Sequence, residues 1–338
     1  MRARIVGIGC CLPDRVETNE ELARLNPEWD LGRIAGKTGI SARHIAAEGE
    51  TSADLGFRAA TQLLERGLVP IDQIDYLIVS TQTPDYLLPS NAALLQARLK
   101  LGRHIGAFDF NHGCSGYVAG LQLAKSLVVS GSARNVLFIT TDTYSKLVHP
   151  KDRTVRALFG DAAAATLIGP ADSGCGEIGE FVVGTDGSGS SSLIVPSGGF
   201  RSPRDATTAV EEVDANACVR TREHLFMDGQ AIFSFALNSV PRAINQLLER
   251  SALTPAQVDW YVYHQANKFM LENLANFSRI PAAKMVYHLE TVGNTVAASI
   301  PLAIDAYVQS GRIQPGQTLV LAGFGVGLSW AVCRVVWG

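Results

Sequence analysis

The sequence predicts an α/β fold built from two similar halves, each with the order strand–helix–strand–helix–strand. Two observations lead to this prediction. An internal repeat relates the two parts of the chain, and apolar strands alternate with amphipathic helices, a pattern in which helices cover the faces of sheets. The length of 338 residues agrees with two such units, because a domain usually holds about 100–200 residues.

The clearer part of the repeat joins the end of an amphipathic helix to a short turn and an apolar strand. Leu63-Leu64-Glu65-Arg66 precedes a strand that ends at Ser80, and Leu247-Leu248-Glu249-Arg250 precedes one that ends just before His264. The two copies are offset by 184 residues without a gap. Such agreement over helix, turn and strand indicates that the two halves share one architecture.

A second, weaker match starts at two glycines. Gly113-Cys114-Ser115 leads into an apolar helix that ends near Gly131, and Gly293-Asn294-Thr295 leads into one that ends near Gly311, at an offset of 180 residues. A strand is expected after each helix. The match places Asn294 at the position that corresponds to Cys114.

The remaining elements complete the two halves. A helix is expected from Ser52 to Arg66, with Thr51 as its N-cap and Asp54 near its positive end. Apolar runs predict strands at residues 3–9, 105–110, 135–140, 162–168, 260–263, 318–322 and 328–336. We therefore expect halves at residues 1–171 and 226–338, with inserted loops and short strands at 172–225. A flexible linker is the alternative for 172–225, disfavoured by its recurring apolar residues.

Composition excludes several function classes. Charged residues make up 18% of the chain, where about 25% is usual, and 47% are hydrophobic, which predicts a large buried area and a subunit interface. The net charge of −3 does not indicate a basic surface that would bind nucleic acid. No apolar stretch is long enough to span a membrane. The first residues read as a strand and not as an export signal, so we expect a cytoplasmic protein.

The six cysteines do not form a recognisable framework. They have no CxxC pair and no Cys/His spacing suited to zinc, so neither disulfides nor a metal site is expected. Each cysteine is then either a small buried hydrophobic residue or a reactive thiol. They are Cys10, Cys11, Cys114, Cys175, Cys218 and Cys333.

Three polar residues fall at matching strand-to-helix corners, where sites form in open α/β sheets. Cys114 precedes a helix, whose free N–H groups and dipole are expected to lower the thiol pKa and favour the thiolate. His264 follows the strand of the second half, and Asn294 lies before a helix that Pro301 prevents from starting much before Ser299. This set supplies a nucleophile, a base or hydrogen-bond donor, and a neutral donor.

Structural interpretations of the same residues stay open. Cys114 alone is equally well a buried packing residue, and Asn294 after Gly293 is also a common turn residue. His112 lies two residues before Cys114, on the same face of an extended chain, and competes with His264 as the histidine of the site. The run Gly323-Phe324-Gly325-Val326-Gly327 lacks the spacing and the following helix of a dinucleotide site, so we expect a hairpin turn.

The chain resembles the β-ketoacyl-acyl-carrier-protein synthase III group of the thiolase superfamily over essentially its whole length. The resemblance lies in these motifs: Lys37-Thr38-Gly39-Ile40 with Arg43-His44, Pro89-Ser90, Gly113-Cys114-Ser115-Gly116, Asp152-Arg153, Phe159-Gly160-Asp161, His264-Gln265-Ala266-Asn267, Gly293-Asn294-Thr295 and Gly323-Phe324-Gly325. The set is highly specific, although no single motif is.

The resemblance implies a thiolase-like, five-layered αβαβα fold, a homodimer, and no cofactor other than coenzyme A thioester as substrate. Cys114 would take an acyl group from acyl-CoA, and malonyl-acyl-carrier protein would then lose carbon dioxide and attack that thioester. His264 and Asn294 would stabilise the enolate, and the backbone N–H groups of Cys114 and Val326 would hold the other oxyanion. Ping-pong kinetics are expected.

The resemblance also implies substrate contacts. Arg153 would contact coenzyme A, Phe324 would lie beside the thiol, and Asn267 would order the site through water. Leu88 would come from the partner subunit and close the acyl pocket. The complete set of implied substrate-binding residues is Lys37, Leu88, Arg153, Phe159, Asn267 and Phe324.

The chain departs from the family pattern at several positions. Trp29 lies nine residues before Thr38, farther than the family's adenine-stacking tryptophan, and Arg33 takes the nearer position. Lys37 stands where the family often has arginine. Phe269 stands where a basic carrier-docking residue is common. These departures leave room for a specialised enzyme of secondary-metabolite or polysaccharide synthesis.

Two other functions compete with the condensing enzyme. One is an acyltransferase on the same fold that passes the acyl group from Cys114 to a non-malonyl alcohol, amine or thiol. The other is a carrier-binding subunit without chemistry, which the intact set of Cys114, His264 and Asn294 disfavours. The sequence leaves open the acyl chain length, the carrier of the acyl group, and whether the pathway is general fatty acid synthesis.

Overall fold

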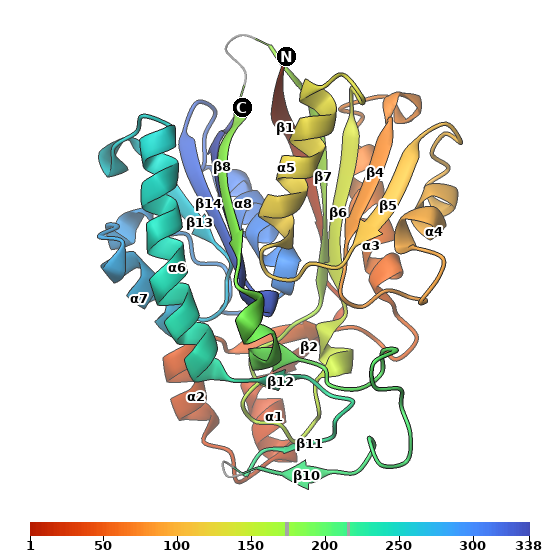
Figure 1. Cartoon of the computed structure of the whole chain (residues 1–338), viewed down its shortest axis with the longest axis vertical. Coiled ribbons are helices and arrows are strands. Elements are labelled where there is room, and N and C mark those ends of the chain that lie inside the picture. The colour runs from red at the N-terminus through yellow and green to blue at the C-terminus, as the bar shows by residue number, and fades with distance from the viewer. Residues whose placement is uncertain (173–175, 215–216) are drawn as a thin grey trace.

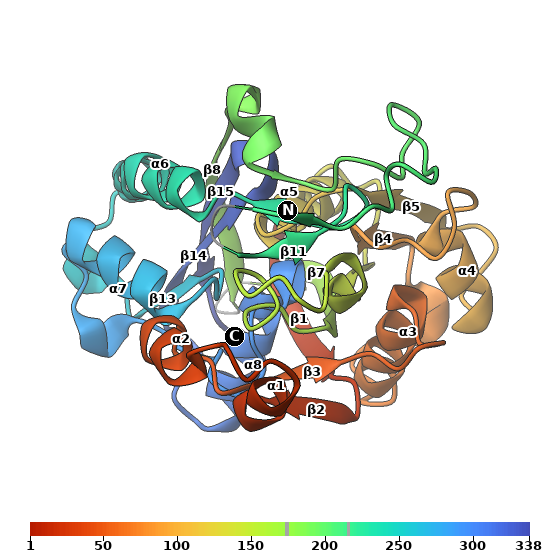
Figure 2. The ribbon, with the colours of Figure 1, turned by 90° about the horizontal axis from the view of Figure 1, so that it is seen from below.

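The computed structural model describes residues 1–172, 176–214 and 217–338, and these residues form five layers (Figure 1). Two sheets are separated by a central pair of helices, and further helices cover the outer face of each sheet. Figure 2 shows these layers end-on. The five-layered αβαβα arrangement is thus confirmed.

The first sheet belongs to the N-terminal half and has five strands in the order β1-β7-β6-β4-β5. Strands β4, β5 and β6 pair in parallel, whereas β7 runs antiparallel to both β6 and β1. Strand β5 forms the free edge of this sheet. The bounds are β1 Arg2–Cys11, β4 Tyr76–Ser80, β5 Gly106–Phe110, β6 Val136–Asp142 and β7 Ala162–Ala171.

The second sheet has four strands in the order β13-β14-β15-β8. Strands β13 and β14 are parallel, and β14, β15 and β8 follow in antiparallel pairs. The turn between β14 and β15 is the hairpin that the sequence predicts at the glycine-rich run. The bounds are β8 Glu177–Thr185, β13 Trp260–Tyr263, β14 Thr318–Gly325 and β15 Ser329–Val336.

The central layer consists of α5 and α8, which pack against both sheets. Both helices are largely apolar, and their buried residues form one continuous core cluster with the inner faces of the sheets. Outside, α3 and α4 cover the first sheet, and α6 and α7 cover the second (Figure 2). The bounds are α3 Ser52–Leu64, α4 Asn91–Arg98, α5 Gly116–Val129, α6 Gly229–Arg250, α7 Lys268–Phe277 and α8 Ser299–Gln309.

The repeat appears as the same arrangement in both halves. Helix α3, a short 3₁₀ turn and β4 correspond to α6, a second 3₁₀ turn and β13. Thr51 caps α3 as expected, in a capping box with Asp54. Helix α8 begins at Ser299, where Pro301 falls in its first turn.

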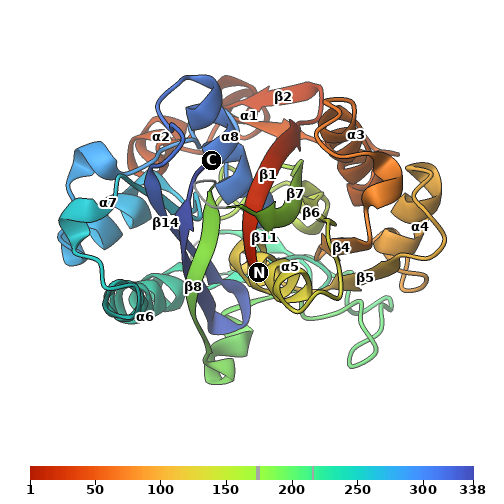
Figure 3. The same ribbon diagram turned by 90° about the horizontal axis from the view of Figure 1, so that it is seen from above.

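Small elements close the end of the molecule away from the two termini (Figure 1 and Figure 3). They include three two-stranded sheets, β2-β3, β12-β9 and β10-β11, and two short helices. The bounds are β2 Arg15–Thr18, α1 Asn19–Leu25, α2 Leu31–Thr38, β3 Ala42–Ile45, β9 Leu193–Ile194, β10 Glu212–Val213, β11 Val219–Arg220 and β12 Phe226–Met227.

The range 172–225 contains more regular structure than the sequence suggests. Strand β8 lies inside it and pairs with β15 along most of its length, so this range contributes a full strand to the second sheet. The expected divisions after residues 171 and 225 stay predictions. Cys175 lies outside the described residues. Over the described part of the chain, no helix is both long and apolar enough to cross a membrane.

Candidate active site

Cys114 lies in the turn between β5 and the central helix α5, and only 6% of its surface is exposed. The backbone N–H groups of Val326 and of Cys114 itself lie close enough to the sulfur to lower the pKa of the thiol. The end of β14 reaches the thiol so closely that a Cβ atom at Gly325 would lie 2.8 Å from Cys114 Sγ. Glycine is required there, because any side chain would displace the sulfur.

The pKa of Cys114 differs from the sequence-based expectation. Burial, and after it the nearby carboxyl group of Asp142, raise the pKa of the thiol to about 12, although the two backbone N–H groups act to lower it. The expected lowering by the helix N-terminus is therefore outweighed by desolvation of the thiolate. The resting site holds a protonated thiol.

His264 directly follows β13 and is 2% exposed. Its Nδ1 atom lies 2.8 Å from Ser299 Oγ, and its ring meets the Phe324 ring edge-on at 5.7 Å. Burial lowers the pKa of His264 to about 3, so the imidazole is neutral at physiological pH. Ser299 has a single hydroxyl hydrogen, for which the Val296 carbonyl oxygen and His264 Nδ1 compete at 2.8 Å each; Nε2 carries the ring proton, and is a neutral donor, in the tautomer in which that hydrogen goes to Nδ1.

Asn294 is held by the short loop that leads into α8. The backbone N–H of Val296 donates to Asn294 Oδ1 at 3.0 Å, so the amide NH₂ end is left as the outward donor. Val296 has a φ of 52°, a left-handed conformation that a β-branched residue rarely adopts. Its carbonyl oxygen lies 2.8 Å from Ser299 Oγ. One strained residue therefore connects Asn294 to the serine that contacts His264.

These contacts bring the three predicted residues together. Gly325 touches the Cys114 sulfur, and the neighbouring Phe324 packs on His264. His264 is connected to Asn294 through Ser299 and Val296. The end of β14 thus contacts both the nucleophile and the neutral donor His264.

A buried charged cluster supports the loop that holds Asn294. The backbone of Asn294 forms hydrogen bonds with Leu158 and Gly160 on the neighbouring loop, at 2.8 and 3.0 Å. Arg43 is fully buried behind that loop and donates to Ala157 O at 3.1 Å. Burial lowers the pKa of Arg43 to about 10.

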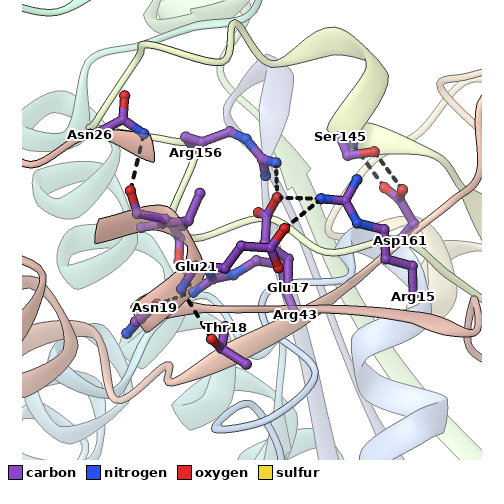
Figure 4. Close-up of polar contacts among 12 residues, drawn as sticks. Arg15, Glu17, Thr18, Asn19, Glu21, Asn26, Arg43, Ser145, Arg156 and Asp161 are labelled. Carbon is purple, nitrogen blue, oxygen red and sulfur yellow. Dashed lines mark hydrogen bonds and ion pairs between the residues drawn. The ribbon is translucent and has the colours of Figure 1, made fainter. Parts of the chain in front are cut away.

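Figure 4 shows how the cluster around Arg43 is closed. Asn19 accepts a hydrogen bond from the Arg43 guanidinium, and Arg156 forms an ion pair with the buried carboxylate of Glu17. Arg15 contacts the same carboxylate at 3.4 Å. The loop that carries Asn294 is therefore supported by paired charges, which makes its position rigid.

A cavity of about 930 Å³ lies near these residues, although Cys114, His264 and Asn294 are not among those that line it. Lys37, Arg153 and Asn267, three of the predicted substrate contacts, line it together with Leu158 and Arg33. Leu158 belongs to the loop bonded to Asn294, and Asn267 lies three residues after His264 and caps α7. The cavity thus combines basic side chains with a floor next to the two donors.

The structure shows where the residues that depart from the family pattern lie. Trp29 is 7% exposed and packs with Leu22, Leu31 and Ala157, so it is a core residue and does not line the cavity. Arg33 lines the cavity instead. Phe269 stacks on Phe233 at 5.3 Å, with Lys37 Nζ 5.1 Å from its ring centre.

The other predicted residues are divided between the interior and the surface. Phe159 is 3% exposed and lies in the same apolar cluster as Cys114 and Phe324. Leu88 is 82% exposed, far from being buried in its own chain. His112 packs its ring on Phe110 at 6.3 Å, and its backbone oxygen accepts from Ser80. This packing favours the structural interpretation of His112.

Sequence reasoning missed Ser299, Tyr144 and Gln82. The sequence identified Ser299 only as the start of a helix. In the fold, its hydroxyl group contacts His264, the residue directly after β13. Tyr144 and Gln82 follow β6 and β4, at strand ends next to the Cys114 corner. The rule that sites form at the ends of parallel strands would have found both. No cluster of three or more His, Cys, Asp or Glu suited to a metal occurs among the residues placed by the structure.

Comparison with known families gives two matches. Residues 108–187 match 3-oxoacyl-[acyl-carrier-protein] synthase III, and residues 248–337 match the C-terminal part of the same synthase. The first segment contains Cys114, and the second contains His264 and Asn294.

Individual relatives match along the full chain. The chain is 36% identical to β-ketoacyl-[acyl-carrier-protein] synthase III of Caldanaerobacter subterraneus, covering 99% of this chain and 98% of the relative. It is 38% identical to the Xylella fastidiosa protein of the same name, covering 97% and 96%.

Solved structures agree with these relatives. A 3-oxoacyl-(acyl-carrier-protein) synthase III structure is 48% identical with a TM-score of 0.97, covering 100% of both chains. The corresponding synthase of Burkholderia xenovorans is 36% identical with a TM-score of 0.92, covering 100% of this chain and 95% of the other.

Proposed function

The chain belongs to the 3-oxoacyl-[acyl-carrier-protein] synthase III family, and from this premise we propose that Cys114, His264 and Asn294 carry its reaction. The enzyme is an acyltransferase of the condensing type: an acyl group from acyl-CoA is condensed with malonyl-acyl-carrier protein to give a β-ketoacyl product. The observation that supports the residue assignment is that the end of β14 contacts both the buried thiol, at Gly325, and the neutral His264, at Phe324.

In the first half-reaction, Cys114 Sγ attacks the acyl thioester carbonyl. The developing oxyanion is held by the backbone N–H groups of Cys114 and Val326, which already point at the sulfur. The carbon–sulfur bond to coenzyme A then breaks, and coenzyme A leaves as the thiol with the proton from Cys114. The acyl group stays on the enzyme as a thioester.

In the second half-reaction, the malonyl thioester oxygen accepts hydrogen bonds from His264 Nε2 and from the amide of Asn294. The carbon–carbon bond to the carboxylate breaks, and its electron pair forms an enolate that these two donors stabilise. The enolate carbon attacks the acyl group on Cys114, and the sulfur leaves and regains a proton. Because both donors are neutral and buried, they stabilise negative charge where it develops and need no reorganisation.

The cavity of 930 Å³ is the proposed approach of both carriers. Arg33, Lys37 and Arg153 line it and match the phosphate groups of coenzyme A or of a phosphopantetheine arm. Asn267 at its floor is placed to order water between the donors and the substrate. No metal or cofactor takes part in this scheme, and the cytoplasm stays the predicted compartment.

We also propose a homodimer. Strand β5 leaves its backbone edge unpaired, and the adjacent loop exposes Tyr86, Leu87 and Leu88 by 60, 78 and 82%. Large apolar side chains exposed beside a free strand edge favour an interface with a second copy. The partner subunit's Leu88 would then reach the acyl pocket. Sedimentation of the wild type and of Leu87→Asp tests this, with a shift to monomer expected for the variant.

The alternative of acyl transfer to a non-malonyl acceptor is not favoured by the curated relatives described above, which carry the synthase name. Intact-protein mass spectrometry tests the proposal. Acyl-CoAs should add one acyl group to the wild type and none to Cys114→Ala, and malonyl-carrier protein should remove it with release of carbon dioxide. An adduct on Cys114→Ala, or removal without carbon dioxide release, would contradict the proposal.

A further inference from the structure

The side of Cys114 that faces the first sheet carries polar groups in an otherwise apolar surrounding. Gln82 follows the end of β4, and its side chain lies against the backbone next to the nucleophile: a Cβ atom at Gly113 would lie 2.5 Å from Gln82 Oε1. The Gln82 amide thus lies against Gly113, the residue that precedes Cys114. It belongs to neither the cavity nor the donor pair described above.

Tyr144 lies beside the same thiol. It is 3% exposed, shares an apolar cluster with Cys114 and Phe159, and packs its ring on Phe159 at 4.9 Å. Its hydroxyl donates to Gln82 Oε1 at 3.1 Å. Besides burial, a charge on Cys114 raises the pKa of the Tyr144 hydroxyl, because the two groups are close enough to interact electrostatically.

Gln82 is fixed from two further directions. Its backbone N–H donates to Asp142 Oδ1 at 2.7 Å, and its Nε2 donates to Asn111 Oδ1 at 3.1 Å. Asp142 is 1% exposed, and its second oxygen, Oδ2, accepts no hydrogen bond from the described residues. The pair formed by Tyr144 and Gln82 is therefore held in place by hydrogen bonds to both ends of the Gln82 amide and to its backbone.

The hydrogen-bonding groups of Tyr144 and Gln82 that are still free determine which acyl group can bind next to them. The Tyr144 hydroxyl hydrogen is used on Gln82, so the phenol oxygen retains its acceptor capacity, and Gln82 Nε2 retains a second hydrogen. One acceptor and one donor side by side match a hydroxyl group. An alkyl chain would leave this remaining acceptor and donor without a partner, and a carboxylate would face the carboxyl group of Asp142.

Chain length is limited by the same residues. The acyl group on Cys114 has to extend away from His264 and Phe324, which occupy the other side of the end of β14. In that direction the buried and mutually packed rings of Tyr144 and Phe159 fill the space. A long chain would have to displace a close-packed interior.

We propose that the acyl group loaded on Cys114 is short and carries a hydroxyl group, and that Tyr144 and Gln82 recognise this hydroxyl. The inference rests on the proposed function, because it presumes that Cys114 is acylated. It goes beyond that function by assigning the substrate class and two specificity-determining residues.

Competitive acylation tests the proposal. The wild type is mixed with equal amounts of butyryl-CoA and either 3-hydroxybutyryl-CoA or 2-hydroxybutyryl-CoA, and the adducts on Cys114 are measured by intact mass at early times. At least one hydroxylated thioester should acylate at least about tenfold faster than butyryl-CoA, because a site built for a hydroxyl discriminates against the analogue that lacks it. Octanoyl-CoA should react more slowly than all three.

Variants separate recognition from folding. Tyr144→Phe removes the phenol oxygen. Because the acceptor is lost, the preference for the hydroxylated thioester over butyryl-CoA should fall to within about twofold. Gln82→Leu removes the donor and should do the same if Tyr144→Phe fails to fold. Tyr117→Phe is the matched control, because it removes another buried tyrosine hydroxyl, which lies 3.3 Å from Thr166 Oγ1 and away from Gln82. It should keep the full preference.

The outcomes distinguish this inference from the proposed function. If butyryl-CoA or octanoyl-CoA acylates Cys114 at least as fast as both hydroxylated thioesters, the inference is wrong while the proposed function stands. The same holds if the preference persists in both Tyr144→Phe and Gln82→Leu. If no acyl thioester, free or on a carrier protein, acylates Cys114, the proposed function fails and the inference fails with it.

Discussion

Cys114 and Asn294 occupy matching corners of the two halves, but the helices that follow them start differently. Helix α5 begins at Gly116, two residues after Cys114, whereas α8 begins at Ser299, five residues after Asn294. The intervening turn contains the strained residue Val296. The first corner therefore presents backbone N–H groups to a sulfur, and the second presents a side-chain amide and a serine to the cleft. One duplicated corner thus provides two kinds of chemistry.

The electrostatics of the two corners also differ. The Cys114 corner contains the buried carboxyl group of Asp142, whose pKa burial raises to about 7. The corner of His264 and Asn294 has no charge at neutral pH, because burial lowers the pKa of His264 to about 3. The thiol and the imidazole are both neutral in the resting enzyme. We propose that the two corners serve separate half-reactions.

The largest effect is expected for Cys114→Ala. Acylation should fall by at least about 1000-fold, because no other thiol takes the place of the nucleophile. Decarboxylation of malonyl-carrier protein should remain within about tenfold of wild type, because its donors lie at the other corner. Intact mass reports the first step, and carbon dioxide release reports the second. Equal loss of both steps would show that the corners do not act separately.

His264→Ala should give the reverse pattern. Removing one of two donors is expected to lower decarboxylation by about 100- to 1000-fold, as for other oxyanion donors. Acylation of Cys114 should change by only a few fold, because the other oxyanion is held by backbone N–H groups. A large loss of acylation in His264→Ala would instead make this histidine the base that activates the thiol.

The acylation rate should rise by about tenfold per pH unit between about pH 7 and pH 10. The thiolate is the nucleophile, and burial raises the thiol pKa to about 12, so the reactive fraction keeps growing over this range. Stopped mixing with acyl-CoA followed by mass analysis gives the rates. A plateau below about pH 8 would mean that the dipole of α5 outweighs burial after all.

Ser299→Ala should lower decarboxylation by about tenfold, because the Nε2 tautomer of His264 loses the hydroxyl that favours it. Ser115→Ala is the matched control: Ser115 is also buried, but its Oγ bonds Ser329 Oγ at 2.7 Å on the Cys114 side. That variant should decarboxylate at the wild-type rate. Ser299→Thr, which retains a hydroxyl group, should recover part of the lost rate, and equal effects at Ser115 and Ser299 would refute the tautomer role.

The smallest effects concern stability against pH. The folded-state pKa of His264, about 3, lies below the ordinary value of 6.5, so the unfolded chain binds more protons between these values. The wild type should therefore lose stability relative to His264→Gln as the pH falls from about 6.5 to 4. The pKa of Asp142 is raised from 3.8 to about 7, so the sign is opposite: the wild type should gain stability relative to Asp142→Asn over the same fall. Denaturant unfolding at several pH values measures both slopes, and slopes of equal sign would contradict the assigned pKa values.

Much of the fold was predictable because it repeats. The helix–turn–strand match at an offset of 184 residues placed β4 and β13 correctly, and with them the strand ends that precede the site. The positions of Cys114, His264 and Asn294 at corners followed from the same match. Strand β8 was not assigned to the second sheet, because pairing with β15 is a long-range contact that leaves no local pattern in the sequence.

The chemistry of the site was less predictable than its location. The pKa of Cys114 depends first on burial and then on residues distant in sequence, because the charge of Asp142 raises it and the backbone N–H of Val326 lowers it. Likewise, Tyr144 and Gln82 follow different strands, and only the folded sheet brings their side chains into contact. The exposed position of Leu88 acquires a meaning only with a second subunit.

The separation of the two half-reactions is tested most directly with Asn294→Ala that has first been acylated on Cys114. Malonyl-carrier protein is added, and carbon dioxide release and loss of the acyl adduct are followed together. The account predicts full acylation, with carbon dioxide release and adduct loss both at least about 100-fold slower than in wild type. Wild-type release of carbon dioxide by the acylated variant, or failure to acylate it, would contradict the account.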